Sequence, residues 1–377
     1  MMQYHVNPQH WQTYALSLSN NAIRHVFTLF FLIPSTFWFK SPLKSFAKIA
    51  LLALPLLSYS WQLQAANGNN NQVKHSDAII LNSREVINYA RPELLYGQAN
   101  GFAGPADIWN PNKGFLIQSN NPVSYSKNFP TTGANGLSFD LLIEGDVDGL
   151  IWDPVTHEGI TATATRTVAY PRSNSNWWWL PPEEDGKIVI RVKLTGPEAK
   201  TQWENDNPRP IRVPKLPQTF ELVGRDSLGN HVIKYGFVLQ KWFVNRGNIK
   251  GFSPNQMSWC NSLGYRLSQV KDLTNQACDR KSSYYFNCSD GVDGAKPASH
   301  HNGYQRQIGA GLFTEWGDMS NYRDGDFKYN GYTTSEIYHS PGTTRDGAYY
   351  IVYSFFGNIL VPANNGNNAL LAVCVTP

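Results

Sequence analysis

Apolar and polar positions alternate through the middle of the chain. In the segment GKIVIRVKLTG, one side collects the apolar residues Ile188, Ile190, Val192 and Leu194. Successive side chains of a strand point to opposite faces, so this pattern predicts a strand with one buried face. The same alternation predicts strands in LSFDLLIEG, GITATATRTVAY, QTFELVG and HVIKYGFVLQKWFVN.

Turn signals such as GANG and DSLGN separate these predicted strands. Several short strands spaced by such turns are typical of an immunoglobulin-like β-sandwich, which we expect over residues 66–247. This part of the chain contains no cysteine, so any such sandwich must be stabilised by its apolar core without a disulfide.

Three consecutive tryptophans interrupt the alternation in SNSNWWWLPPEEDG. Neighbouring residues on a strand face opposite ways, so all three cannot be buried on one face. They pack beneath a neighbouring loop or against a second domain, or they anchor a partner. We keep Trp178 as a candidate receptor contact, because tryptophan is favoured at binding hot spots.

The pattern changes to a helical one in SPNQMSWCNSLGYRL. Ser253 is the expected N-cap, with Pro254 at the first helical position and Gln256 completing a capping box. Gly264 supplies the left-handed stop. The helix carries Cys260, and a second helix is expected in SQVKDLTN.

Strands are expected again toward the C-terminus. The segments concerned are GLFTEWG, YTTSEIY, AYYIVYSFFG, NILVPA and ALLAVCV. The chain is therefore expected to be β-rich, with a sandwich followed by an α+β domain over residues 248–377.

Residues 1–65 differ in composition from the rest and are expected to be an extended leader. Four of the 32 basic residues lie there, and none of the 28 acidic ones does. The second of its two short apolar blocks, IALLALPLLSYSW, predicts a signal peptide cleaved after Ala65 or Ala66. A membrane hairpin is the alternative, but both blocks are short for spanning helices and contain proline.

The chain after the leader is electrically neutral, which gives no support for binding nucleic acid or an anionic membrane. Export favours disulfides, and all four cysteines lie in the last third. A Cys278–Cys288 bridge would close a turn-rich loop that is poor in apolar residues. This leaves Cys260 for Cys374, a bond that would tie the last strand to the first helix.

The sequence offers little catalytic chemistry. His300 and His301 are adjacent, so on an extended chain their side chains point apart and make a poor metal pair. Common nucleophile, phosphate and metalloprotease motifs do not occur. We expect no enzyme activity, no cofactor and no metal, with turn or solvated roles for the acidic residues Glu315, Asp318, Asp324 and Asp326.

Several segments together resemble a known family. WCNSLGYRLSQVKDL, LFTEWGDMSNY, YTTSE and LAVCV resemble the C-type-lectin-like fold at the tip of intimin and invasin, adhesins of Gram-negative bacteria. FPTTGANGLSFDL is similar to the immunoglobulin-like repeats that precede such tips. The resemblance covers residues 76–377 and implies a C-type-lectin-like domain over residues 248–377.

The resemblance implies an exported adhesin, secreted or at the cell surface, that binds a host-cell protein or surface glycan. The EPN, QPD and WND motifs of calcium-dependent lectins are missing from the last third, so binding without calcium is expected. The loop SSYYFNC supplies aromatic contacts or packs as the core of its own loop. The candidate receptor-binding residues are Tyr284, Tyr285, Phe286, His300, His301 and Trp178.

Two other functions stay open. Formylglycine-generating enzymes have a similar C-type-lectin-like scaffold, and fold does not fix function. An enzyme would need His300, His301 and Asp318 to converge in one pocket. The other alternative is that the chain is a structural subunit of a surface assembly with an outer-membrane partner.

Overall fold

The computed structural model describes residues 85–98, 101–169, 180–277, 292–362 and 369–377. Within these ranges the chain is β-rich with short helices, which confirms the expected class. None of the helices described there has the length and apolar character needed to cross a membrane. The predicted residues Trp178, Cys278, Tyr284, Tyr285, Phe286 and Cys288 lie outside the described residues.

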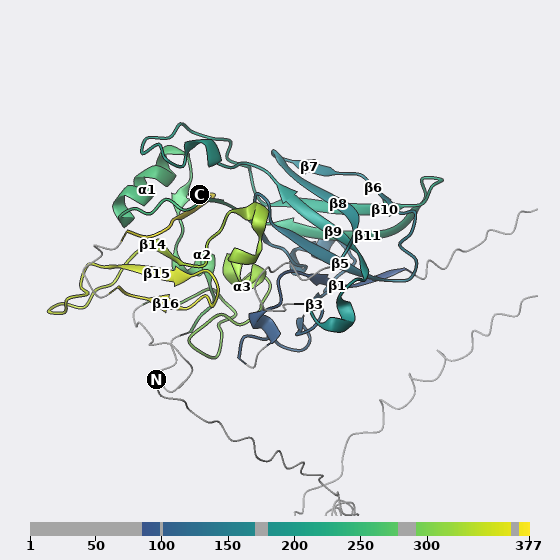
Figure 1. Ribbon diagram of the computed structural model, residues 1–377, viewed down its shortest axis with the longest axis horizontal. Helices are drawn as coiled ribbons and strands as arrows, with labels where there is room; N and C mark the ends of the chain where they lie inside the picture. Colours follow the sequence, from purple (N-terminus) through teal and green to yellow (C-terminus); the bar gives the residue numbers. More distant parts are fainter. Residues whose placement is uncertain (1–84, 99–100, 170–179, 278–291, 363–368) are drawn as a thin grey trace, which may run out of the picture. The chain divides into compact units, whose positions relative to one another are not determined.

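Two antiparallel sheets form a sandwich, seen on the right of Figure 1. The larger has the order β2-β3-β1-β5-β9-β8-β7, and the smaller has the order β11-β10-β6. The larger sheet contains β1 (Val86–Arg91), β2 (Trp109–Asn110), β3 (Gly114–Leu116), β5 (Ser138–Glu144), β7 (Val155–His157), β8 (Ile160–Val168) and β9 (Ile188–Thr195). The smaller contains β6 (Ile151–Trp152), β10 (Gln218–Arg225) and β11 (His231–Leu239).

Aromatic side chains fill the space between the two sheets. Phe139 of β5 meets Phe237 of β11 edge-on at 6.1 Å between ring centroids, and Phe220 of β10 stacks on Phe237 at 5.3 Å. All three rings are buried. This half thus holds together by apolar packing, as expected from a region without cysteine.

The predicted alternation is present in the strands. In β9, Ile190, Val192 and Leu194 are fully buried, while Ile188 at the strand's start is 43% exposed. The long segment HVIKYGFVLQKWFVN forms two strands, because the chain leaves the sandwich after β11 and enters a different sheet as β12.

Among its described residues, the C-terminal part contains two small sheets and three α-helices. One sheet has the order β13-β17-β12-β4, and the other has the order β14-β15-β16. The strands are β4 (Thr132–Ala134), β12 (Lys241–Asn245), β13 (Arg266–Leu267), β14 (Gly331–Ile337), β15 (Tyr349–Tyr353), β16 (Ile359–Leu360) and β17 (Val373–Val375). The helices are α1 (Ser253–Ser262), α2 (Val270–Leu273) and α3 (Leu312–Trp316).

One predicted strand is wrong: GLFTEWG forms the helix α3. Gly311 and Gly317 flank it with φ of 102° and 82°, and the Gly317 N–H donates to the Phe313 carbonyl. All five residues of α3 are buried. A short apolar run buried on every side does not distinguish a strand from a helix, which explains the error.

The predicted N-cap of α1 is also wrong. Phe252 occupies the cap position without a side-chain bond, and Ser253 is the first helical residue. The Ser253 hydroxyl instead pairs with the Thr333 hydroxyl at 2.6 Å, so the serine joins α1 to β14. Gly264 does adopt the left-handed conformation expected of it, with φ of 88°.

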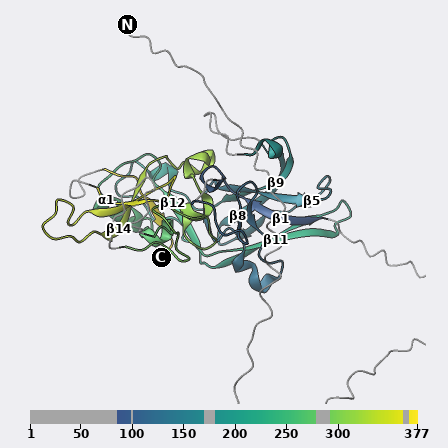
Figure 2. The same ribbon diagram turned by 90° about the horizontal axis from the view of Figure 1, so that it is seen from below.

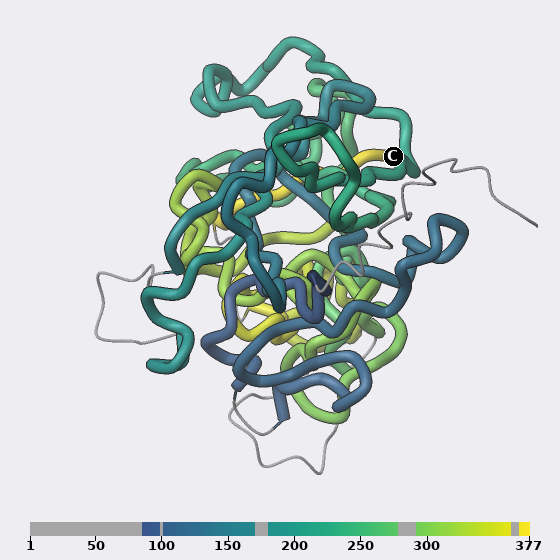
Figure 3. Tube along the Cα trace, turned by 90° about the vertical axis from the view of Figure 1, so that its right-hand side faces the viewer, coloured from purple at the N-terminus to yellow at the C-terminus, as the bar shows by residue number. Residues whose placement is uncertain are grey.

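A disulfide joins Cys260 in α1 to Cys374 in β17, with their α-carbons 5.4 Å apart. The structure therefore confirms the Cys260–Cys374 bond that was expected from the sequence. β17 also lies between β12 and β13 in its sheet, and the Thr376 N–H donates to the Trp242 carbonyl. Figure 3 shows the C-terminal end beside segments from the middle of the chain.

The sheet of β17 crosses the expected boundary at residue 247. β4 comes from the N-terminal side of that boundary and pairs in parallel with β12, which in turn pairs with β17. Residues 78–377 form one compact unit. Figure 2 shows β12 between the strands of the sandwich and β14.

We predict that replacing both Cys260 and Cys374 by alanine lowers the free energy of unfolding by about 4–5 kcal/mol, because the bond closes a very long loop. Urea unfolding followed by tryptophan fluorescence measures the change. Asn261→Ala, on the exposed side of α1, is the control and should shift the free energy by less than about 0.5 kcal/mol. An unchanged unfolding midpoint in the double variant would contradict the prediction.

Candidate functional site: an aromatic surface above a buried ion pair

Aromatic side chains from separate segments gather on one part of the chain. They come from the segment that follows β1, from the segment before β14, and from the end of β15 and the turn after it. We call this set the aromatic surface; its members are Tyr96, Phe102, Tyr329, Tyr353, Phe355 and Phe356.

The rings form a continuous series of contacts. Tyr329 lies flat on Phe355, with 3.7 Å between centroids and 4° between planes. Phe355 meets Phe356 edge-on at 4.6 Å, and Phe356 meets Tyr96 at 4.4 Å. Tyr329 keeps 53% of its surface exposed, whereas Phe355 beneath it keeps 8%. The outer face of the Tyr329 ring is therefore available to a partner.

A glycine turn places the two phenylalanines. β15 ends at Tyr353, so the SFFG end of the predicted strand AYYIVYSFFG is a turn. Gly357 has φ of 61°, and its N–H donates to the Tyr353 carbonyl. A β-carbon on Gly357 would lie 2.6 Å from the Tyr304 ring, so the turn also packs directly on the segment below it.

The two predicted histidines lie at the edge of the aromatic surface. His301 packs edge-on against Phe102 at 4.9 Å, and its Nε2 bonds to the Gly101 carbonyl. Burial lowers the pKa of His301, and the neighbouring His300 lowers it further. His301 is therefore held inside the fold, and His300 is the exposed member of the pair.

A buried ion pair lies close behind the aromatic surface. Arg306 Nη2 is 3.1 Å from Glu93 Oε2, and the two side chains are 0% and 2% exposed. The Glu93 carboxylate also accepts the main-chain N–H groups of Leu95 and Asp318. Burial raises the pKa of Glu93 to about 7, because the loss of water outweighs the opposing effect of Arg306.

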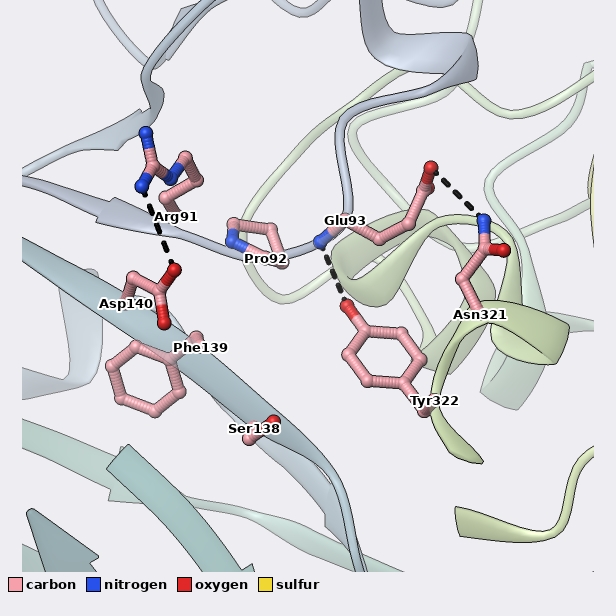
Figure 4. Close-up of a pocket in the computed structure, with 8 residues that line it drawn as sticks. All are labelled: Arg91, Pro92, Glu93, Ser138, Phe139, Asp140, Asn321 and Tyr322. Atoms are coloured by element: carbon pink, nitrogen blue, oxygen red, sulfur yellow. Dashed lines mark hydrogen bonds and ion pairs between the residues drawn. The ribbon is translucent and has the colours of Figure 1, made fainter. Parts of the chain in front are cut away.

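Figure 4 shows Glu93 reaching toward Asn321 and Arg91 reaching toward Asp140 on the neighbouring strand β5. A cavity of about 10 Å³ lies between these side chains, with Tyr322 in its lining. This volume corresponds to about one water molecule. The cavity is too small for an organic ligand, so this cluster supports the fold and is not itself a binding pocket.

Glu315, an acidic candidate from the sequence, is a buried link between distant segments. Its carboxylate accepts five hydrogen bonds, from the main-chain and hydroxyl groups of Thr131 and Thr132 and from the N–H of Gly309. Burial raises the pKa of Glu315, and these bonds act against that rise. The carboxylate is fully used within the fold.

The remaining acidic candidates are also engaged within the chain. Asp318 accepts from the N–H and hydroxyl of Ser320, and burial raises the pKa of this aspartate. Asp324 and Asp326 pair with lysines of the sandwich side at 2.6 and 2.8 Å. Across the part of the chain that the structure describes, no three His, Cys, Asp or Glu residues are placed to hold a metal ion.

None of the six members of the aromatic surface was among the binding residues predicted from the sequence. The doubled Phe355-Phe356 was visible, but it stood at the end of a predicted strand and gave no sign of a turn. Tyr96 and Phe102 lie more than two hundred residues earlier in the chain. Only the folded chain brings these segments together.

The sequence matches no protein-family model and no curated protein. The structure is similar to that of invasin, a bacterial integrin-binding protein, with a TM-score of 0.39, 11% identity and coverage of 78% of this chain and 39% of invasin. It is similar to an intimin mutant of EHEC O157:H7, with a TM-score of 0.33, 12% identity and coverage of 71% and 92%.

A third similar structure is the C-terminal 282-residue fragment of intimin in complex with the intimin-binding domain of Tir, with a TM-score of 0.36, 12% identity and coverage of 74% of this chain and 65% of the fragment. The match to invasin covers 39% of the invasin chain, which is well under two thirds of its length. Invasin and intimin are the adhesins that the sequence segments resemble.

We predict that Glu93→Gln changes how stability depends on pH. The pKa of Glu93 is higher in the folded chain, about 7, than its ordinary 4.5, so the folded state binds more protons between these values. The free energy of unfolding of the native chain, relative to the variant, should therefore fall as pH rises from about 4.5 to 8, by up to about 3 kcal/mol.

Urea unfolding of both chains at intervals of pH measures this difference. His301 is present in both chains, so its contribution to the pH dependence cancels in this difference. Parallel curves for the native chain and the variant would show that Glu93 does not titrate there.

Proposed function

We propose that this chain is an exported bacterial adhesin-type protein that binds a host-cell protein, without calcium, through the aromatic surface. The observation that carries the proposal is the series of contacting rings that ends in the exposed ring of Tyr329. The resemblance of the C-terminal segments to the tips of intimin and invasin and the predicted signal peptide fit the same function.

The geometry of the aromatic surface suits a protein partner. Tyrosine and phenylalanine bring large contact area with few rotatable bonds, and they are common in binding hot spots. Phe355 and Phe356 are fixed by ring contacts, so little side-chain freedom remains to be lost on binding. The side chain of Tyr329 is hydrogen-bonded to that of Tyr96, which fixes this ring as well.

The fold holds this surface rigidly. The turn that carries Phe355 and Phe356 lies within the loop closed by the Cys260–Cys374 bond. Glu315 and Arg306 connect the neighbouring segments to the sandwich side of the chain through Thr131 and Glu93. Rigid presentation reduces the entropy cost of binding.

Calcium has no part in the proposed contact. The carboxylates of Glu315 and Asp318 accept hydrogen bonds from other groups inside the fold. The rings that remain available attract a partner by apolar contact and by hydroxyl hydrogen bonds. Binding is therefore expected to persist in a chelator such as EDTA.

We predict that Tyr329→Ala weakens binding of the mature chain to cultured epithelial cells about tenfold or more, as expected for an aromatic hot spot. Leu228→Ala is the matched control, because Leu228 is 85% exposed but lies in the turn between β10 and β11 of the sandwich. Titration of labelled chain against the cells, with EDTA present, gives both affinities.

Treatment of the cells distinguishes the kind of receptor. Protease digestion should abolish binding, and glycosidase digestion should leave it unchanged. Equal affinities for Tyr329→Ala and Leu228→Ala, or binding that only glycosidase removes, would contradict a protein receptor at the aromatic surface.

A further inference from the structure

The segment Tyr304–Arg306 touches the aromatic surface through its main chain. The Tyr304 N–H donates to the Phe356 carbonyl at 2.8 Å, and the Arg306 N–H donates to the Phe102 carbonyl at 2.8 Å. Phe102 and Phe356, which are far apart in the sequence, are thus both hydrogen-bonded to the main chain of the segment Tyr304–Arg306. The position of that segment sets the distance between them.

The side chain of Arg306 fixes this segment from within. Its guanidinium is 0% exposed, pairs with Glu93 and donates from Nη1 to the Glu315 carbonyl at 3.0 Å. It also lies over the Trp109 ring at 4.8 Å and the Tyr304 ring at 5.3 Å. One planar cation therefore contacts the turn after β1, the helix α3 and the segment Tyr304–Arg306.

Three glycines allow the backbone to approach Arg306 closely. A β-carbon on Gly97 would lie 2.9 Å from its Nε, and one on Gly317 would lie 2.0 Å from its Nη2. A β-carbon on Gly104 would lie 2.1 Å from the Arg306 carbonyl oxygen. Gly97 and Gly104 lie on either side of Phe102 in the sequence, so the segment that carries Phe102 is packed directly on Arg306.

Trp109 extends the same arrangement. Its indole N–H donates to the Gly97 carbonyl at 2.8 Å, next to Tyr96 of the aromatic surface. The Arg306 guanidinium packs on the Trp109 ring, and the Trp109 indole is hydrogen-bonded to the main chain next to Tyr96. Glu93, three residues before Tyr96, is held by the same guanidinium from the other direction.

We propose that Arg306 is the positioning residue of the aromatic surface: its guanidinium sets the places of Tyr96, Phe102 and Phe356, and with them the shape that the partner meets. This rests on the function proposed above and adds to it a buried residue that does not touch the partner. Lysine cannot replace Arg306, because an ammonium neither stacks as a plane between two rings nor donates in several fixed directions.

The test compares Arg306→Lys with the native mature chain. The variant keeps the positive charge beside Glu93 but loses the planar contacts with Trp109 and Tyr304. We expect its affinity for epithelial cells to fall about tenfold. We also expect amide hydrogen exchange at Leu95, Gly97 and Arg306 to become at least about tenfold faster, while exchange in α1 stays as in the native chain.

Leu222→Ala is the matched control for a general loss of stability. Leu222 is fully buried in β10 of the sandwich, so its truncation destabilises the chain without touching Arg306. Its affinity for the cells and its exchange at Leu95 and Gly97, measured relative to α1, should equal those of the native chain.

The outcomes separate this proposal from the function on which it rests. Unchanged local exchange in Arg306→Lys, or an equal change in Leu222→Ala, overturns the positioning role whatever the chain binds. Faster local exchange together with an affinity that falls for Tyr329→Ala but not for Arg306→Lys also overturns it. If no variant binds cells differently while local exchange changes as expected, the receptor assignment fails and the role of Arg306 in shaping the aromatic surface stands.

Discussion

The carboxylate of Glu315 imposes the constraint on which the described fold depends. A charge taken out of water is tolerated only where hydrogen bonds replace its hydration, and Glu315 finds these bonds on Thr131 and Thr132. Thr132 begins β4, and Thr131 directly precedes it; β4 pairs with β12. Separation of the sandwich side from the C-terminal side would break the hydrogen bonds from both threonines, so Glu315 couples the stability of the two sides.

The same rule shapes the interior behind the aromatic surface. Glu93 and Arg306 are buried as a pair, and the space around them is filled by rings and by main chain at glycine positions. Polar groups therefore link these segments, and aromatic rings pack between them. The aromatic surface is the outer layer of this arrangement, and its shape follows from charges that no partner reaches.

Much of the fold could be predicted from local pattern. Strands such as β9 are predicted by their alternation of apolar and polar residues, and the Cys260–Cys374 bond was expected from the placement of the four cysteines. Helix α3 could not be predicted, because its apolar run is buried on all sides. The roles of Glu315 and Arg306 were equally hidden, since their partners Thr131 and Glu93 are about two hundred residues away and no local pattern links them.

The central place of β17 has a mechanical consequence. A load applied at Phe356 enters the chain inside a covalent ring, because Cys374 is bonded to Cys260. The load passes to the rest of the molecule through β17 and β12, whose antiparallel ladder resists sliding by several hydrogen bonds acting together. Tension applied at Phe356 would therefore reach β12 by two covalent routes, one along the backbone through α1 and one through Cys374 and its bond to Cys260.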